Sequence, residues 1–210
     1  MSDPVFSAEC TLCPRLATFL EDVRQQHPDY YAKPVPPFGD AKAQLLIVGL
    51  APGYHGANAS GRPFTGDFAG ILLYETLYAC GLSTAPVSKS VDDGLQLMNC
   101  RITNAVKCLP PQNKPESSEI NTCNTYLKNE LAGLQPGSVL LALGTIAHHA
   151  VLKARGLKLS QFKFVHGAEH IIPGLTLIDS YHCSRYNTQT RRLTADMFKS
   201  VMMQAKSKLP

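Results

Sequence analysis

The sequence predicts an α/β protein, organised as a three-layer α/β/α sandwich. Short apolar runs alternate four times with stretches of helical periodicity, and the apolar runs are continuous rather than alternating. Continuous apolar strands are typical of strands buried on both faces, so we expect a parallel sheet with helices covering each side. Because 210 residues suffice for one well-buried core, we expect residues 1–210 to form a single domain.

The elements follow one another in a regular order. A helix is expected first, near Pro14 to Gln25, and the proline-rich KPVPPFGD follows it as an irregular connection. The alternation then runs through AQLLIVGL, FAGILLYETLYACGL, CRITNAV, SSEINTCNTYLKNELAGL, SVLLALG, TIAHHAVLKARG and GLTLIDSYH. A last helix, capped by Thr194, carries apolar residues at three- and four-residue spacing, which predicts one buried face. These residues are Met197, Phe198, Val201, Met202, Ala205 and Leu209.

Composition excludes two broad classes of protein. Apolar residues make up 44% and charged residues 17%, which excludes a disordered chain, and the longest apolar runs are of strand length, so no membrane partner is expected. The net charge of +4 is compatible with a polyanionic partner without requiring one. Met1 to Pro4 carry no pattern of a secretory signal, so we expect a cytoplasmic, reducing location in which cysteines are thiols or metal ligands.

Four of the seven cysteines have the spacing of metal ligands. Cys10 and Cys13 form a C-x-x-C before the first helix, and Cys108 and Cys123 bracket a loop and half a helix. Four thiolates suit either zinc or an iron–sulfur cluster, and spacing alone does not separate the two. Cys80 and Cys100 are expected to be small core residues. Cys183 is equally compatible with a core position and with a contact in a site.

The stretch from Gly49 to Gly70, GLAPGYHGANASGRPFTGDFAG, is a glycine-rich loop between two apolar segments. Its glycines match neither G-x-G-x-x-G nor a Walker loop, so it is no ordinary nucleotide-binding turn. In an open parallel sheet, ligands bind at the carboxyl ends of the strands. This loop, NAVKC and SYHCSRYN all follow predicted strands, and we expect them to meet at that edge.

Four features occur together: the early C-x-x-C, GLAPG…HGAN…GRPFTGD, TNAVKC with a cysteine fifteen positions on, and SYHCSRYNTQTRRLT. In this combination the chain resembles the iron–sulfur branches of the uracil-DNA glycosylase superfamily, most of all the type B, or fifth, family. The resemblance implies a central four-stranded parallel sheet and hydrolysis of the N-glycosidic bond to a damaged base in DNA. It also implies a structural [4Fe-4S] cluster held by Cys10, Cys13, Cys108 and Cys123, with zinc as the alternative.

The resemblance assigns roles to five residues, four of which also have a purely structural interpretation. Phe64 would stack on the extruded base, or else be a core aromatic. Asn104 would pair with uracil N3 and O4, or else cap a turn. Asp67 would stabilise the sugar cation and orient water, and it is also an N-cap candidate. His182 would donate to uracil O2 together with backbone N–H groups near Leu50, or else be structural.

The polar segment after His182 is a candidate DNA contact. Arg185 and Tyr186 would wedge into the duplex, and Arg191 and Arg192 would hold phosphates, unless the segment is simply an exposed polar loop. Cys183 stands where the family usually has proline, which is a departure from its pattern.

The sequence therefore favours a monofunctional glycosylase that removes uracil from DNA, with hypoxanthine and xanthine as further candidate bases. The expected partner is DNA with deaminated bases, single- or double-stranded, and the protein is expected to be a monomer. A non-catalytic damaged-DNA-binding protein of the same fold is the alternative. A Rossmann-type oxidoreductase is disfavoured because G-x-G-x-x-G is missing.

Overall fold

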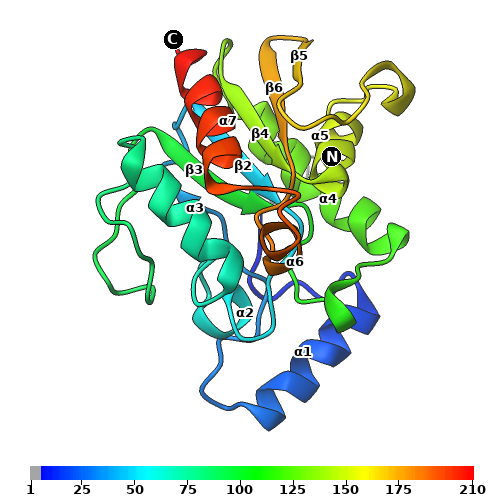
Figure 1. The fold of residues 1–210 in the computed structure, drawn as a ribbon. Coiled ribbons are helices and arrows are strands. Elements are labelled where there is room, and N and C mark those ends of the chain that lie inside the picture. The colour runs from blue at the N-terminus through cyan, green and yellow to red at the C-terminus, as the bar shows by residue number, and fades with distance from the viewer. Residues whose placement is uncertain (1–5) are drawn as a thin grey trace.

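The computed structural model describes residues 6–210 (Figure 1). The sequence-based interpretation of Met1 to Pro4, and the first five residues of the expected domain, lie outside this part of the chain. Within it, no helix is long and apolar enough to cross a membrane.

A six-stranded sheet forms the middle of the molecule, in the order β1-β3-β2-β4-β6-β5. The central strands β3, β2, β4 and β6 are parallel, and both edge strands run antiparallel to their neighbours. Their bounds are β1 Phe38–Gly39, β2 Leu45–Gly49, β3 Cys100–Asn104, β4 Val139–Leu143, β5 Glu169–Ile172 and β6 Leu175–Ser180. Strands β2 and β4 are buried at every residue, which explains their uninterrupted apolar sequence.

Helices cover both faces of the sheet, as Figure 1 shows. On one face lie α3 (Phe68–Ala79) and α7 (Ala195–Ser207), and on the other α4 (Ser117–Ala132) and α5 (Thr145–Ala154). Each face has its own buried apolar cluster, centred on Leu77 and Phe198 on the first side and on Leu127 and Val151 on the second. The fold class is therefore the three-layer α/β/α sandwich predicted from the sequence.

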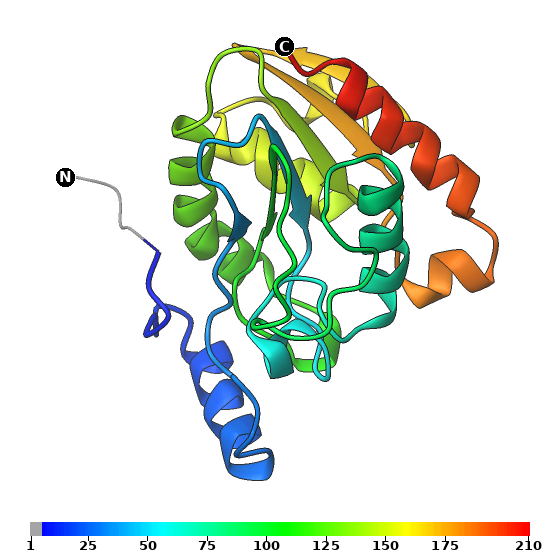
Figure 2. The ribbon, with the colours of Figure 1, turned by 90° about the vertical axis from the view of Figure 1, so that its left-hand side faces the viewer.

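The first helix, α1 (Pro14–Gln26), lies outside the three layers and extends beyond the end of the sheet (Figure 2). It buries Leu16, Leu20 and Val23 in a third cluster that includes Cys108 and Cys123. Four shorter helical segments complete the chain: α2 (Ala57–Ser60), η1 (Pro111–Asn113), η2 (Leu159–Gln161) and α6 (Arg185–Gln189).

The structure adds detail to three sequence-based expectations. The expected four-stranded parallel sheet is present, but it is widened by β1, which lies within the supposedly irregular KPVPPFGD, and by β5. The polar segment after His182 is not a loop throughout, because Ser184 caps the five-residue helix α6. Thr194 caps α7 as predicted, since its side chain accepts from the backbone N–H of Met197 at 3.2 Å.

Candidate active site

The carboxyl ends of the parallel strands meet above one pocket. Gly49 at the end of β2 is paired with Asn104 at the end of β3, and Leu143 of β4 with Ser180 of β6. The pocket there has a volume of about 490 Å³, within the usual range for small-ligand sites. Six of the sequence-predicted site residues line it: Leu50, Phe64, Asp67, Asn104, His182 and Arg185.

Asn104 has an amide oxygen with no partner. The side chain is 3% exposed, and its Oδ1 is buried without a hydrogen bond. Leaving a buried acceptor unpaired costs about 1–3 kcal/mol. Gly49 makes room for this oxygen, because a Cβ at Gly49 would lie 2.4 Å from Asn104 Oδ1. Asn104 lines the pocket, and its Oδ1 is an acceptor for which the described residues supply no donor.

Phe64 is held in a strained backbone conformation. Its φ is +55°, in the left-handed region that costs a non-glycine residue free energy. Surrounding contacts fix the loop: Tyr74 Oη donates to the carbonyl oxygen of Pro63 at 2.9 Å, and the buried Arg62 forms an ion pair with Asp93 at 2.7 Å. The ring is 6% exposed, so Phe64 belongs to the core cluster and lines the pocket as well.

Asp67 caps α3 at the pocket. Its Oδ1 accepts from the backbone N–H of Gly70 at 2.7 Å. Burial raises the pKa of this carboxyl above its ordinary value, and the backbone hydrogen bonds at the helix start oppose that shift. A Cβ at Gly56 would lie 2.5 Å from Asp67 Cβ, so glycine is needed there for the loop to close over the carboxylate. The sequence-based N-cap interpretation is thus confirmed, and it leaves the second oxygen available to the pocket.

His182 lies across the pocket from the glycine-rich loop. Its ring stacks on that of Phe64, with centroids 5.9 Å apart and planes at 29°. Its backbone carbonyl accepts from Asn187 Nδ2 at 2.8 Å, which ties the turn after β6 to α6. Desolvation lowers the pKa of His182 to about 4, so the imidazole is neutral at physiological pH and has one N–H to donate.

The four candidate DNA contacts differ in their position. Arg185 lines the pocket, with its guanidinium 5.8 Å from the centroid of the Phe68 ring. Tyr186 is 70% exposed, as a side chain that could enter a duplex would be. Arg191 lines a neighbouring groove, and Arg192 lies over the Tyr181 ring at 4.5 Å. Arg191 and Arg192 do not line the pocket; both are exposed on the protein surface beside it.

Sequence reasoning missed several lining residues: Ala51, Gly53, Phe68, Ala69, Asn113, Leu143, Gly144, Thr145, Ile146 and Ser184. Thr145 and Ile146 could have been found, because LALGTI also follows a predicted strand, at the same edge of the sheet. Phe68, directly after Asp67, lies 41% exposed at the pocket and carried no sequence signal of its own.

The four spaced cysteines form a second site beside α1. All four line one small pocket with apolar neighbours such as Leu16 and Val106. The backbone N–H of Lys107 points to Cys123 Sγ at 3.3 Å. Burial raises the pKa of Cys123 to about 11, and the charges of the neighbouring cysteines add to this shift. Four thiolates here therefore require a cation to offset their desolvation and repulsion.

The spacing of the four thiols can be compared with what each candidate centre requires. Zinc with four thiolates at about 2.3 Å holds its sulfurs roughly 3.8 Å apart. In the described part of the chain, no three of these sulfurs lie within 4.8 Å of one another. A four-iron cluster is wider than one ion and separates its ligands more, so the residues present fit a cluster of this kind.

The remaining cysteines are core residues. Cys80, Cys100 and Cys183 are 4%, 0% and 0% exposed and belong to the same apolar cluster. This confirms the expectation for Cys80 and Cys100. It also answers the open question at Cys183, which is a core residue that does not line the pocket.

These features define an α/β protein with a ligand pocket at its strand ends and a separate four-cysteine centre. The chain belongs to the uracil DNA glycosylase superfamily, whose family model matches residues 36–206. It is 47% identical to the type-5 uracil-DNA glycosylase of Thermus thermophilus, over 94% of this chain and 92% of that protein. The type-5 uracil-DNA glycosylase of Pyrobaculum aerophilum is 41% identical over 93% of this chain and 87% of its own length. A type-4 uracil-DNA glycosylase of Saccharolobus solfataricus is 30% identical over 83% and 77%.

Proposed function

We propose that this protein is a uracil-DNA glycosylase that hydrolyses the N-glycosidic bond of uracil in DNA and leaves an abasic site. The observation that carries the proposal is the unpaired, buried Oδ1 of Asn104 in the wall of the pocket that Phe64, Asp67 and His182 share. The similarity to type-5 uracil-DNA glycosylases over more than nine-tenths of the chain supports it independently.

Base recognition follows from Asn104 and Phe64. A glycosylase must first extrude the nucleotide, at a cost of a few kcal/mol. Stacking of the base on Phe64 offsets this by roughly 1–3 kcal/mol. Asn104 Oδ1 then accepts from uracil N3–H, and its amide donates to O4. Cytosine has no hydrogen at N3 and an amine at C4, so it would leave the buried oxygen unpaired.

Bond cleavage needs opposite charges stabilised on either side of the breaking bond. The sugar acquires oxocarbenium character while the base leaves with negative charge. Asp67 would face the sugar, where its carboxylate stabilises the cation and orients the attacking water. The neutral His182 would donate a hydrogen bond to uracil O2, together with backbone N–H groups near Leu50.

Strand cleavage is not part of the proposed reaction. Among the described residues that line the pocket there is no lysine to form a Schiff base with the sugar. The base alone is therefore released. Arg185 and Tyr186 at the pocket rim would fill the gap in the duplex, and Arg191 and Arg192 would hold flanking phosphates.

We further propose that Cys10, Cys13, Cys108 and Cys123 hold a [4Fe-4S] cluster. When bound, the cluster supplies a link between the N-terminal segment and the start of α4, and no chemistry at the base. None of the seven cysteines is in a disulfide, which is consistent with our proposal that the protein acts in the reducing environment of the cytoplasm. Iron and sulfide analysis of anaerobically purified protein tests this: four of each per chain are expected, and one zinc without iron would refute it.

The activity is tested by single-turnover release of uracil from single- and double-stranded oligonucleotides, with Asp67→Asn as the variant. Asparagine keeps the oxygen that accepts from Gly70 N–H, so the helix cap survives while the charge is lost. We expect the rate to fall by at least 100-fold with DNA affinity nearly unchanged. An unaltered rate would remove Asp67 from the mechanism.

The same assay separates the proposal from its rivals. Wild-type protein that binds uracil-containing DNA but releases no base at enzyme excess would be a binding protein of this fold. Hypoxanthine and xanthine belong in the panel, because the pocket of about 490 Å³ has room for a purine. We propose that both are accepted, and that the chain acts as a monomeric, single domain. Elution at twice the monomer mass on a sizing column would contradict the monomer.

A further inference from the structure

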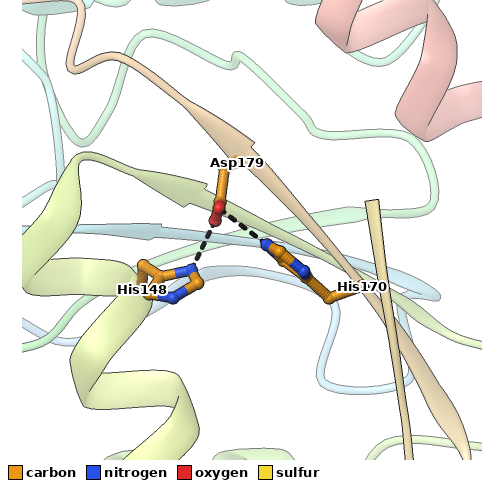
Figure 3. Close-up of side chains that lie close together, drawn as sticks. All are labelled: His148, His170 and Asp179. Carbon is orange, nitrogen blue, oxygen red and sulfur yellow. Dashed lines mark hydrogen bonds and ion pairs between the residues drawn. The ribbon is translucent and has the colours of Figure 1, made fainter. Parts of the chain in front are cut away.

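A cluster of titratable residues lies outside the pocket, where α5, β5 and β6 meet (Figure 3). His148 Nδ1 lies 2.7 Å from Asp179 Oδ1, and His170 Nε2 lies 3.0 Å from Asp179 Oδ2. His148 and Asp179 are fully buried, and His170 is 14% exposed. Among the described residues, these three form the one group of histidine, cysteine and acidic residues whose ligand atoms all lie within 4.8 Å.

The ring of His148 is oriented as in a metal-binding histidine. Its Nε2 is 2.9 Å from the carbonyl oxygen of Phe162, which can only accept, so Nε2 carries a hydrogen. Metal-ligating histidines commonly donate their other ring N–H to such a carbonyl, which fixes the tautomer. The remaining nitrogen, Nδ1, therefore points at Asp179 as a potential ligand atom.

The carboxylate of Asp179 is also fixed in place. Each of its oxygens faces one imidazole, and the backbone N–H of Val165 approaches Oδ2 at 3.4 Å. A zinc ion with bonds of about 2.0–2.2 Å to nitrogen and oxygen holds its ligand atoms roughly 3.3 Å apart. The ligand atoms of all three residues lie within 4.8 Å of one another, so adjustment of these side chains would bring them to one ion.

We propose that His148, His170 and Asp179 bind a divalent transition metal ion of the zinc class. Two imidazoles and one carboxylate suit zinc, whereas calcium and magnesium prefer all-oxygen sites. The ion enters from the side of His170, the least buried ligand, where water completes a tetrahedral shell. Binding replaces the hydrogen bond between His148 Nδ1 and Asp179 by a bond from each residue to the metal.

The site joins three elements, two of which reach the glycosylase pocket. Helix α5 begins with Thr145 and Ile146, which line the pocket, and β6 leads directly to His182. The ion would act here as a structural clamp and take no part in base release, because none of its three ligands lines the pocket. Zinc should therefore raise the melting temperature without changing the rate of uracil release.

Zinc titration of the cluster-bearing protein by calorimetry tests the site, after treatment with a mild chelator. Iron and sulfide are counted in every sample, so that zinc entering the cysteine site is detected as lost iron. The test variant is His170→Gln, which keeps the His148–Asp179 contact and the fold. The matched control is His149→Gln, because the His149 ring is 5.6 Å from that of His148 but lies outside the ligand group.

We expect wild type and His149→Gln to bind one zinc with iron content unchanged, and His170→Gln to bind it at least tenfold more weakly. The proposal is overturned if wild type takes up no zinc beyond the His170→Gln level. It is equally overturned if the His149 control loses binding to the same degree.

Discussion

Replacing Asn104 by alanine should move activity and stability in opposite directions. The variant loses the acceptor for uracil N3–H, and a hydrogen bond to a group acquiring charge contributes about 1.5–3 kcal/mol. At 1.36 kcal/mol per tenfold change, kcat/KM for uracil release should fall by roughly 10- to 100-fold. The measurement is steady-state release from a single-stranded oligonucleotide with one uracil.

The free protein should become more stable. Asn104 Oδ1 is buried without a partner, a cost of about 1–3 kcal/mol that alanine removes. The side chain borders an open pocket, so its loss enlarges that pocket instead of leaving a sealed void. We expect the free energy of unfolding to rise by about 1 kcal/mol, or the melting temperature by about 2–4 °C.

Ser138→Ala is the matched control. Ser138 Oγ is also buried without a partner, but Ser138 directly precedes β4, at the amino ends of the parallel strands, whereas the pocket lies at their carboxyl ends. This variant should gain stability and keep full activity. If Asn104→Ala lost stability and activity together, the residue would be structural and the reasoning would be wrong.

Three further variants test the pocket. Phe64→Leu keeps an apolar side chain but loses the aromatic plane, so kcat/KM should fall about 10- to 100-fold; equal activity would exclude stacking. Gly49→Ala puts a Cβ 2.4 Å from Asn104 Oδ1 and 2.6 Å from Phe64 Cζ, and should lower kcat/KM more than tenfold. In Gly53→Ala the added Cβ meets nothing closer than 3.5 Å, so this variant should keep its activity. Folding lowers the pKa of His182 from 6.5 to about 4, so as the pH falls the unfolded chain takes up a proton before the folded protein does. The free energy of unfolding should therefore drop by about 3 kcal/mol as the pH falls from 6.5 to 4. Urea unfolding of His182→Asn should lack this drop, and a pH dependence identical to that of wild type would refute the argument.

The sequence was sufficient for the central fold because the signal there is local. Strands β2 and β4 are continuous apolar runs, and such runs are buried on both faces whatever their neighbours. The edge strand β1 was not predicted, because its signal is not local. Strand β1 has two residues, within a proline-rich segment, and it is defined only by pairing of Phe38 and Gly39 with β3, which is distant in sequence.

In the site, too, features set by local sequence could be predicted and long-range contacts could not. Asp67 is an N-cap by local rules, and the structure bears that out. Contacts between distant side chains were not predictable, as with Arg62 and Asp93, which are 31 residues apart and hold the loop of Phe64. The pairing of His148 with Asp179 was not predictable either, because these residues are 31 positions apart in the sequence.

The position of α1 has a consequence for how the chain matures during synthesis. The helix has 13 residues, a length at which an isolated helix is marginal in water. Its anchor is a bond from Arg15 Nε to Glu119 Oε1 at 2.8 Å, across a sequence separation of 104 residues. The first helix to leave the ribosome therefore lacks this contact until more than half of the chain has followed, and until then the N-terminal arm stays open to proteases.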